Sequence, residues 1–158
     1  MQFRARNVQK NSPPVDIYDH QSFSAYFRKI VGWSMASRMQ TSLALNALLM
    51  AVRRRKPTEK VIVHSDQGSK FTSHEWRYFL NVHNLEVSMS RRGKCYDNPV
   101  AGSFFHLLKT ESIRRKTYKT RKEARQDVFD YIELFYNPKC RHANNGMLSP
   151  VEYEMATK

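Results

Sequence analysis

Residues 61–109 read VIVHSDQGSKFTSHEWRYFLNVHNLEVSMSRRGKCYDNPVAGSFFHLLK, and the prediction of the fold starts from this stretch. It begins with Val61, Ile62 and Val63, a short apolar and β-branched run that is typical of a strand buried on both faces of a parallel sheet. The run passes into a polar segment that contains glycine, so Asp66 stands where a strand gives way to a loop. Because ligands bind at that edge of open α/β sheets, we expect a functional carboxylate at Asp66.

The rest of the chain carries the signals of alternating strands and helices. Strands are expected at residues 15–18, 22–27, 29–35, 61–63 and 85–89, with the first three forming a meander. Helices are expected at residues 41–52 and 72–83, from residue 98, from residue 120 to the Asn137-Pro138 pair, and from residue 149. Capping boxes at residues 72–75 and 120–123 support two of these helix starts. This order predicts one α/β domain.

Helical spacing indicates which faces of two helices are buried. In the helix that begins at residue 98, the core face is expected to carry Ala101, Phe104, Phe105 and Leu108. Gly102, His106 and Lys109 share another face of that helix. In the helix that begins at residue 120, the expected core face carries Ala124, Val128, Ile132 and Phe135.

Composition limits the class of protein. A chain of 158 residues suffices for one domain with a core. The formal net charge of +13 favours a polyanionic partner, of which nucleic acid is the commonest, and the cations cluster at residues 53–56, 91–94 and 114–116. The sequence has neither a signal-peptide core nor an apolar run of membrane-spanning length. Cys95 and Cys140 lack the spacing of a disulfide framework, so we expect free thiols and a cytoplasmic location.

Four separated motifs resemble one known family. They are HSDQGSKFTS at 64–73, SMSRRGKCYDNPVAGSFFHLLKTE at 88–111, YNPKCRH at 136–142 and LSPVEYE at 148–154. In this order they resemble the catalytic half of bacterial insertion-sequence transposases, whose second reading frame carries a retroviral-integrase-like core. The resemblance implies an α/β ribonuclease-H-like fold, with a mixed five-stranded sheet flanked by helices and, here, a shortened N-terminal hairpin. We expect an irregular basic arm at residues 1–14 and an integrase-like catalytic core domain at residues 15–158.

The resemblance also implies a catalytic site of three acids, Asp, Asp and Glu, which hold two Mg²⁺ (or Mn²⁺) ions. Asp66 matches the second acid. In the family thirty-five residues separate the second acid from the third, and that spacing leads from Asp66 to Gly102. The family reads an AESFF-like segment where this chain reads AGSFF. We therefore expect a transposase core for DNA transposition and integration that lacks one metal ligand and is catalytically defective.

The position of the first acid is open between Asp16 and Asp19. Asp16 lies only twelve positions before Arg28, whereas the family has roughly twenty residues between its first-acid strand and the corresponding segment. Either the first hairpin has lost residues and Asp16 is the first acid, or the first strand is absent and residues 15–19 belong to the second. We favour Asp16, with Asp66, as the metal ligands. In the family the first-acid strand lies beside the strand that precedes Asp66.

DNA is the partner that the resemblance implies, together with a second copy of the chain or a full-length transposase, and no membrane. The candidate DNA-binding residues are Lys70, Arg91, Arg92, Lys94, Tyr96, Lys109, Arg141 and His142. The expected location is the bacterial cytoplasm, in association with the nucleoid. The alternative to a transposase core is a non-catalytic DNA-binding remnant that poisons the full-length protein. The sequence does not separate natural decay from deliberate inactivation, nor from an unexpressed product.

Overall fold

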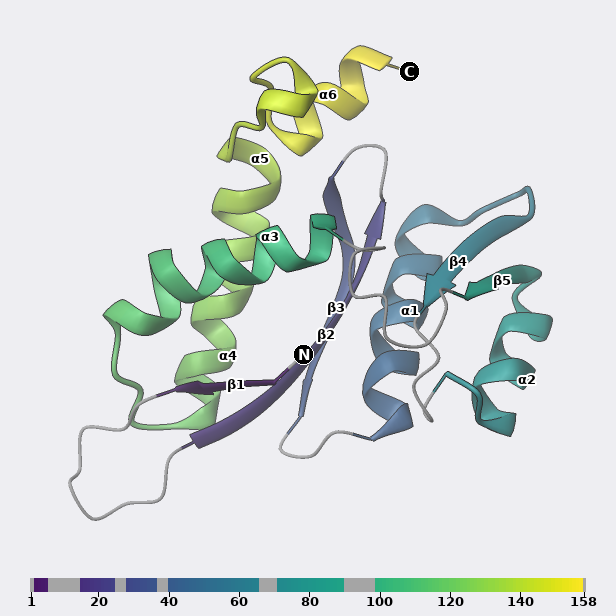
Figure 1. The fold of residues 1–158 in the computed structure, drawn as a ribbon, viewed down its shortest axis with the longest axis horizontal. Helices are drawn as coiled ribbons and strands as arrows, with labels where there is room; N and C mark the ends of the chain where they lie inside the picture. The colour runs from purple at the N-terminus through teal and green to yellow at the C-terminus, as the bar shows by residue number, and fades with distance from the viewer. Residues whose placement is uncertain are drawn as a thin grey trace.

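The computed structural model describes residues 2–5, 15–24, 28–36, 40–65, 71–89 and 99–157 (Figure 1). The strands are β1 (Gln2–Ala5), β2 (Val15–Ser24), β3 (Lys29–Ala36), β4 (Val61–Ser65) and β5 (Leu85–Met89). The α-helices are α1 (Thr41–Arg55), α2 (His74–Val82), α3 (Pro99–Leu107), α4 (Arg121–Asp130), α5 (Asn137–Lys139) and α6 (Pro150–Thr157). The π-helical turns are η2 (Leu108–Ser112) and η4 (Tyr131–Tyr136), and the 3-10 turns are η3 (Ile113–Arg115) and η5 (Ala143–Asn145).

The five described strands form two ladders and not one five-stranded sheet. β1, β2 and β3 form an antiparallel sheet with β2 in the middle, and β4 pairs with β5 in parallel. A single sheet needs a strand that joins the two ladders. The outer neighbour of β2 is β1, which has four residues and pairs with residues 15–18 of β2, and among the described strands β1 has no second partner.

The N-terminal region differs from the prediction in two respects. The expected irregular arm at residues 1–14 contains the strand β1, whose backbone groups pair with β2. The two short strands expected at residues 15–18 and 22–27 are one strand as far as Ser24, because the polar residues between them continue the ladder with β3. A register shift between Ser22 and Phe23 accommodates the change in pattern.

β3 approaches α1 so closely that only glycine fits at residue 32. A Cβ atom on Gly32 would lie 2.1 Å from the carbonyl oxygen of Ala47 and 2.8 Å from the backbone nitrogen of Ala51. Gly32 therefore allows the strand and the helix to pack backbone against backbone. The helix predicted at residues 41–52 is confirmed as a core helix, and it continues to Arg55.

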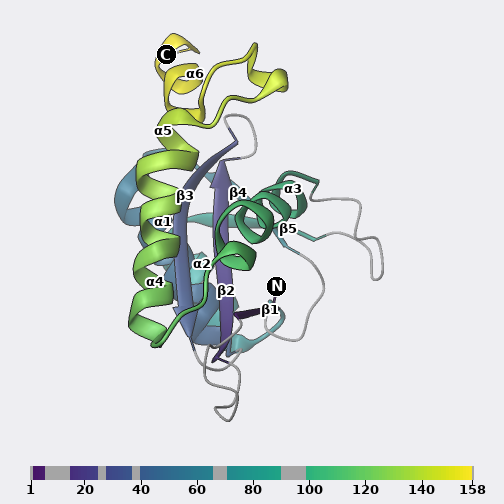
Figure 2. The same ribbon diagram turned by 90° about the vertical axis from the view of Figure 1, so that its left-hand side faces the viewer.

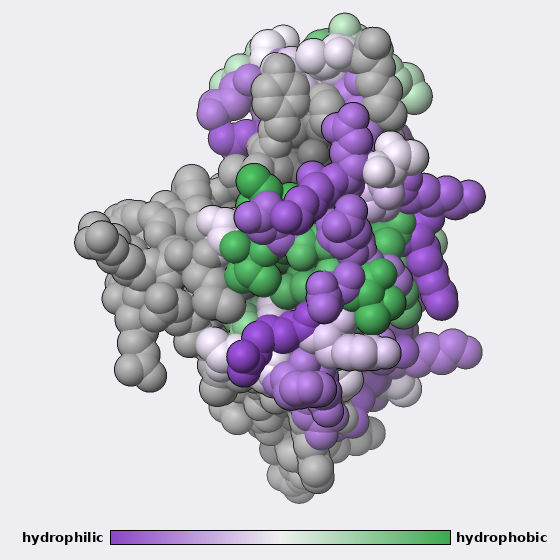
Figure 3. Space-filling view, turned by 90° about the vertical axis from the view of Figure 1, so that its right-hand side faces the viewer, coloured by the Kyte–Doolittle hydropathy of each residue, from purple (hydrophilic) through white to green (hydrophobic). Residues whose placement is uncertain are grey.

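β4 is more exposed than its apolar sequence predicts. Val61 is 42% exposed and Ile62 is 66% exposed, so the strand is not buried on both faces. Val63 packs against a small core that includes Trp76 and Leu80 of α2. Among the described strands β4 is hydrogen-bonded to β5 alone, which leaves much of its apolar surface uncovered. On the face of the molecule that carries β4, β5 and α2, apolar side chains lie between polar ones (Figure 3).

The larger core joins β3 to two long helical segments, α3–η2–η3 and α4–η4–α5. Phe104 and Leu108 have no exposed surface, and they pack with residues that include Val128 and Ile132. The predicted core face of α3 is confirmed at Phe104, Phe105 and Leu108, while the side chain of Ala101 is outside the described ones. None of the helices in the described part of the chain has the length and apolar character needed to cross a membrane.

The predicted core face of the second segment is wrong at one position. Phe135 is 42% exposed, whereas its neighbours Tyr131 and Tyr136 are buried. These residues lie in the π-helical turn η4, where hydrogen bonds run from residue i to i+5. Because the wider turn rotates the following residues relative to an α-helix, Tyr136 takes the inward position.

Asn137 holds the second segment to the backbone of β3. Its side-chain oxygen accepts the N–H of Ile30 and its amide donates to the carbonyl of Ile30, both at 3.0 Å. The buried amide thus satisfies backbone groups as a neighbouring strand does. The helical segment ends at Lys139, one residue after the Asn137-Pro138 pair that was predicted to close it.

Candidate active site

The residues expected around the catalytic centre follow the ends of β4 and β5. Ser65 and Met89 are Cα partners, so the two parallel strands end at the same edge. Asp66 comes directly after β4 and lies outside the described residues. The same holds for five candidate DNA-binding residues, Lys70, Arg91, Arg92, Lys94 and Tyr96. The roles of these residues remain predictions. They rest on the position of the residues after β4 and β5, at the edge of the sheet where α/β proteins bind ligands.

Both candidates for the first acid lie on β2. Asp16 is the Cα partner of Arg4 in β1, and Asp19 is the partner of Met35 in β3. The expectation that the first-acid strand lies beside the strand preceding Asp66 is not met by the described ladders, since β2 is bonded to β1 and β3 and β4 is bonded to β5.

Gly102 lies in the first turns of α3, on the face opposite the core. The residue is exposed, as is His106 one turn later, while Phe104 and Phe105 on the other side are buried. A Cβ atom built on Gly102 meets no heavy atom within 4 Å. Residue 102 therefore has room for a side chain, and glycine is not required there by packing or by a positive φ angle.

Gly102→Ala is expected to raise the free energy of unfolding by about 0.5–1 kcal/mol, because alanine loses less backbone entropy than glycine in a helix. Urea denaturation measures the change. Gly146→Ala is the matched control: Gly146 has a φ angle of +63° with equally open surroundings, so alanine there should destabilise the protein. The same sign of change for both variants would contradict this account of residue 102.

The described residues do not provide a site for two divalent ions. They contain no group of three or more His, Cys, Asp or Glu side chains able to hold a metal. Residue 102 contributes no oxygen ligand, although a pair of Mg²⁺ or Mn²⁺ ions needs several convergent carboxylates. Asp66 lies outside these residues, so the two-ion centre that the sequence resemblance implies stays a prediction.

Three candidate DNA-binding residues are described, and their environments differ. Lys109 is half-buried in η2, and Arg141 is exposed. His142 packs edge-on against the ring of Tyr136, with centroids 5.2 Å apart. Burial, and then the charge of Arg28, lower the pKa of His142, so its ring is neutral at pH 7. The Nε2 atom of His142 is buried, so the role of this residue in DNA binding stays a prediction.

A contact that the sequence did not reveal joins the two helical segments. The hydroxyl of Tyr131 in η4 donates to Glu111 Oε2 in η2 at 2.7 Å. Burial, followed by the bond to the Glu111 carboxylate, raises the pKa of Tyr131 above its usual value. Both partners lie in π-helical turns, which sequence periodicity does not predict.

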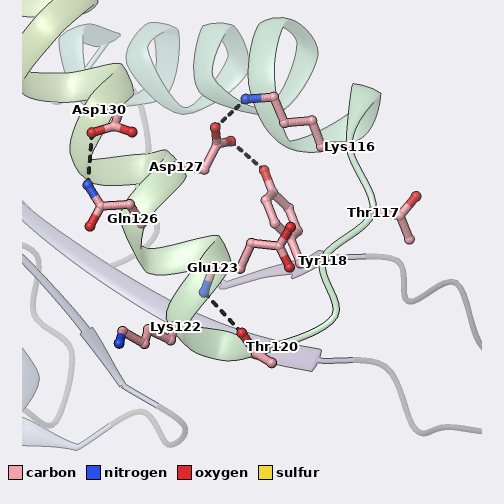
Figure 4. A pocket seen from close by; sticks show the side chains of 9 residues that line it. All are labelled: Lys116, Thr117, Tyr118, Thr120, Lys122, Glu123, Gln126, Asp127 and Asp130. Carbon is pink, nitrogen blue, oxygen red and sulfur yellow. Dashed lines mark hydrogen bonds and ion pairs between the residues drawn. The ribbon is translucent and has the colours of Figure 1, made fainter.

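An open hollow of about 650 Å³ beside α4 contains several acids, but it is not a metal site. Asp127 accepts a hydrogen bond from Ser112. It also accepts hydrogen bonds from Lys116 and Tyr118 (Figure 4). Burial would raise the pKa of Asp127, but these three bonds and the Lys116 charge outweigh it and hold the pKa below its usual value. The Asp127 carboxylate is thus fully engaged in holding the connection between η3 and α4.

Comparison with known proteins points to one family. Two family models, both described as integrase core domain, match residues 18–95 and 102–157. The transposase InsF for insertion sequence IS3A of Escherichia coli (strain K12) is 46% identical over 127 residues, which cover 80% of this chain and 44% of the relative. The transposase for insertion sequence element IS904 of Lactococcus lactis is 41% identical over 138 residues, covering 87% of this chain and 54% of the relative. The chain thus spans about half the length of these relatives.

Two solved structures of retroviral integrase cores have a similar fold. The catalytic core domain of HTLV-2 integrase in complex with magnesium, in its trimeric form, superposes with a TM-score of 0.58 at 11% identity, over 97% of this chain and 91% of that one. The catalytic core domain of BIV integrase gives a TM-score of 0.58 at 11% identity, over 99% and 92%. At this identity the likeness shows the fold alone: a retroviral integrase core, or ribonuclease-H-like, arrangement.

Proposed function

Because this chain belongs to the integrase-core family of insertion-sequence transposases, we propose that it is a transposase core domain for DNA transposition whose catalytic site lacks the third acid. In this reading Asp66 and Asp16 are the remaining acids of the site, and Gly102 marks the position of the lost glutamate. The partner is DNA, joined by a second copy of the chain or by a full-length transposase. The cellular site is the bacterial cytoplasm.

The observation that supports the catalytic defect is the state of residue 102. The residue stands where the family's spacing from Asp66 puts the third acid, on an exposed face of α3. Its surroundings are open, so neither packing nor backbone conformation selects glycine there. The loss therefore removes a ligand without a compensating structural gain. Removing one carboxylate from a two-ion centre costs several kcal/mol of transition-state stabilisation.

The second candidate function is DNA binding without catalysis. It is favoured by the exposed cations of the described residues, which include Lys119 and Arg121 and which do not depend on an intact metal centre. In this case the chain occupies element ends or assembles with a full-length transposase and blocks it. Both candidate functions predict that the chain binds DNA. They differ only in whether a chain with the third acid restored at residue 102 joins DNA.

The first test is a joining assay with the native chain. The protein is incubated with a pre-cut element end, plasmid DNA and Mn²⁺, and the joined products are separated on a gel. We expect no joining above the metal-free background, together with retention of DNA in a binding assay on the same sample. Metal-dependent joined products from the native chain would refute the proposed defect.

A further inference from the structure

The basic clusters of the sequence that the structure describes differ in how many of their cations form ion pairs. In the cluster at residues 53–56, Arg54 pairs with Glu133 at 2.8 Å and Arg55 pairs with Glu154, so this cluster serves partly to hold the fold together. The cluster at 91–94 lies outside the described residues. The cluster at 114–116 continues into further cations, and it is the part of the basic surface that the candidate site does not use.

Five cations between η3 and the first turn of α4 face solvent. They are Arg114, Arg115, Lys119, Arg121 and Lys122, and all five residues are exposed. Within the described ranges none of the five side chains forms an ion pair, in contrast to Arg54 and Arg55. We call these five residues the 114–122 surface.

Hydrogen bonds of Asp127 and Glu123 order the backbone that carries the 114–122 surface. Asp127 forms an ion pair with Lys116 and accepts hydrogen bonds from the hydroxyls of Ser112 and Tyr118. Glu123 Oε2 accepts the backbone N–H of Lys119 at 2.8 Å, and the N–H of Glu123 is accepted by the Thr120 hydroxyl. Figure 4 shows the bonds of Asp127 to Lys116 and Tyr118, and the bond between Glu123 and Thr120. Asp127 offsets the charge of Lys116, and the exposed Glu123 is a single negative charge among the five cations, so most of their positive charge stays uncompensated.

The 114–122 surface lies at the far end of the helical segment from Gly102. Arg114 follows Gly102 by twelve residues along α3, η2 and η3, which corresponds to about 18 Å at the rise of an α-helix. Figures 1 and 2 both show the connection to α4 leaving the end of this segment that is remote from β4 and β5. The surface is thus separate from the predicted catalytic edge, at a distance that a few base pairs of duplex DNA span.

We propose that the 114–122 surface is a second DNA-contact surface, which binds backbone phosphates next to the segment held at the catalytic edge. The choice of DNA as the polyanion rests on the proposed function. Arginine and lysine side chains on an ordered backbone release counterions when they contact phosphates, without reading the base sequence. The contact is therefore non-specific, independent of metal ions and strongly dependent on salt.

The test measures binding of a fluorescent random-sequence duplex by anisotropy, without divalent metal, over a range of salt concentrations. The variants are Arg114→Gln with Arg115→Gln, and Lys119→Gln with Arg121→Gln and Lys122→Gln. The matched control is Arg53→Gln with Lys56→Gln, which removes two exposed charges from residues without an ion pair in the described structure. Circular dichroism melts check that each variant is folded.

The arginine pair variant should lower the slope of log K against log salt by about 2 and weaken binding at least about tenfold near 0.1 M salt. The triple variant should lower the slope by about 3, and the control should change affinity less than about twofold. Equal losses in the control and the test variants, or no binding by the native chain, overturn the proposal. Because the assay needs no chemistry, this result is independent of the joining assay that tests the catalytic defect.

Discussion

Gly102→Glu is expected to join a pre-cut element end to plasmid DNA in Mn²⁺ at a rate about three decades above that of the native chain. The new carboxylate restores an oxygen ligand on the helix face opposite the core. The substitution needs no repacking, since residue 102 is exposed and a Cβ atom there meets no heavy atom within 4 Å. Glutamate is also favoured over glycine inside a helix by about 0.5–1 kcal/mol, so the variant should be at least as stable as the native protein.

Gly102→Gln is the matched control, because glutamine has nearly the size and helix propensity of glutamate without its charge. It should share the gain in stability and show no gain in joining. Calorimetry on all three proteins measures Mn²⁺ binding, and so tests whether the side chain at residue 102 binds the metal independently of whether the protein joins DNA. If Gly102→Glu binds Mn²⁺ but joins no DNA, the defect lies at the first acid on β2, and the account centred on residue 102 is wrong. Equal joining by the native protein and Gly102→Glu contradicts it as well.

Local signals in the sequence predicted several features of the fold correctly. α2 begins one residue later than its predicted capping box implies, since Ser73 and not Thr72 caps it by accepting the N–H of Trp76. Thr120 caps α4 as predicted by accepting the N–H of Glu123, but the Glu123 carboxylate accepts the N–H of Lys119 and not that of Thr120. A reciprocal cap opens α6, where Ser149 and Glu152 bond to each other's backbone. These features depend on residues three or four apart, so a short window of sequence contains all the information that they need.

Features that depend on distant parts of the chain were not predictable. The exposure of Ile62 follows from how many strands pair with β4, and an apolar run does not encode that number. The outward position of Phe135 follows from a π-helical turn, which breaks the 3.6-residue period on which the prediction relied. The 114–122 surface is visible in the sequence only as charge. The structure adds that its five cations are exposed and form no ion pair within the described ranges.

Glu154→Gln is expected to lower the free energy of unfolding at pH 7 by about 3 kcal/mol. Glu154 lies in α6, is only 4% exposed, and pairs with Lys29 of β3 at 2.8 Å and with Arg55 of α1. It therefore ties the C-terminal helix to two elements of the N-terminal half. Glutamine keeps the shape but not the charge, and it leaves two partly buried cations without their shared carboxylate. The expected loss of about 3 kcal/mol is at the low end of the range for breaking a buried ion pair, because Lys29 and Arg55 both retain some exposure to water.

Acid unfolding gives an independent measure of the same contact. Burial alone would raise the pKa of Glu154, but hydrogen bonds from Lys29 and Arg55 and their charges outweigh it and lower the pKa to about 2. The pKa in the unfolded chain is about 4.3, so folding favours the ionised form. The stabilisation is therefore complete above about pH 5 and is lost as the pH falls toward 2. In Glu154→Gln this part of the acid-induced loss of stability should disappear.

Glu59→Gln is the control for both measurements, because Glu59 is exposed and has no ion pair within the described ranges. It removes the same charge and should change the free energy of unfolding by no more than about 0.5 kcal/mol, with the acid dependence of the native protein retained. Urea titrations at several pH values give both quantities. A similar loss in the two variants would mean that net charge, and not the bridge between α6, β3 and α1, controls stability. If Glu154→Gln loses stability in acid as much as the native protein does, the ionisation of Glu154 does not cause that loss. This result would contradict the stabilising role given to the Glu154 carboxylate.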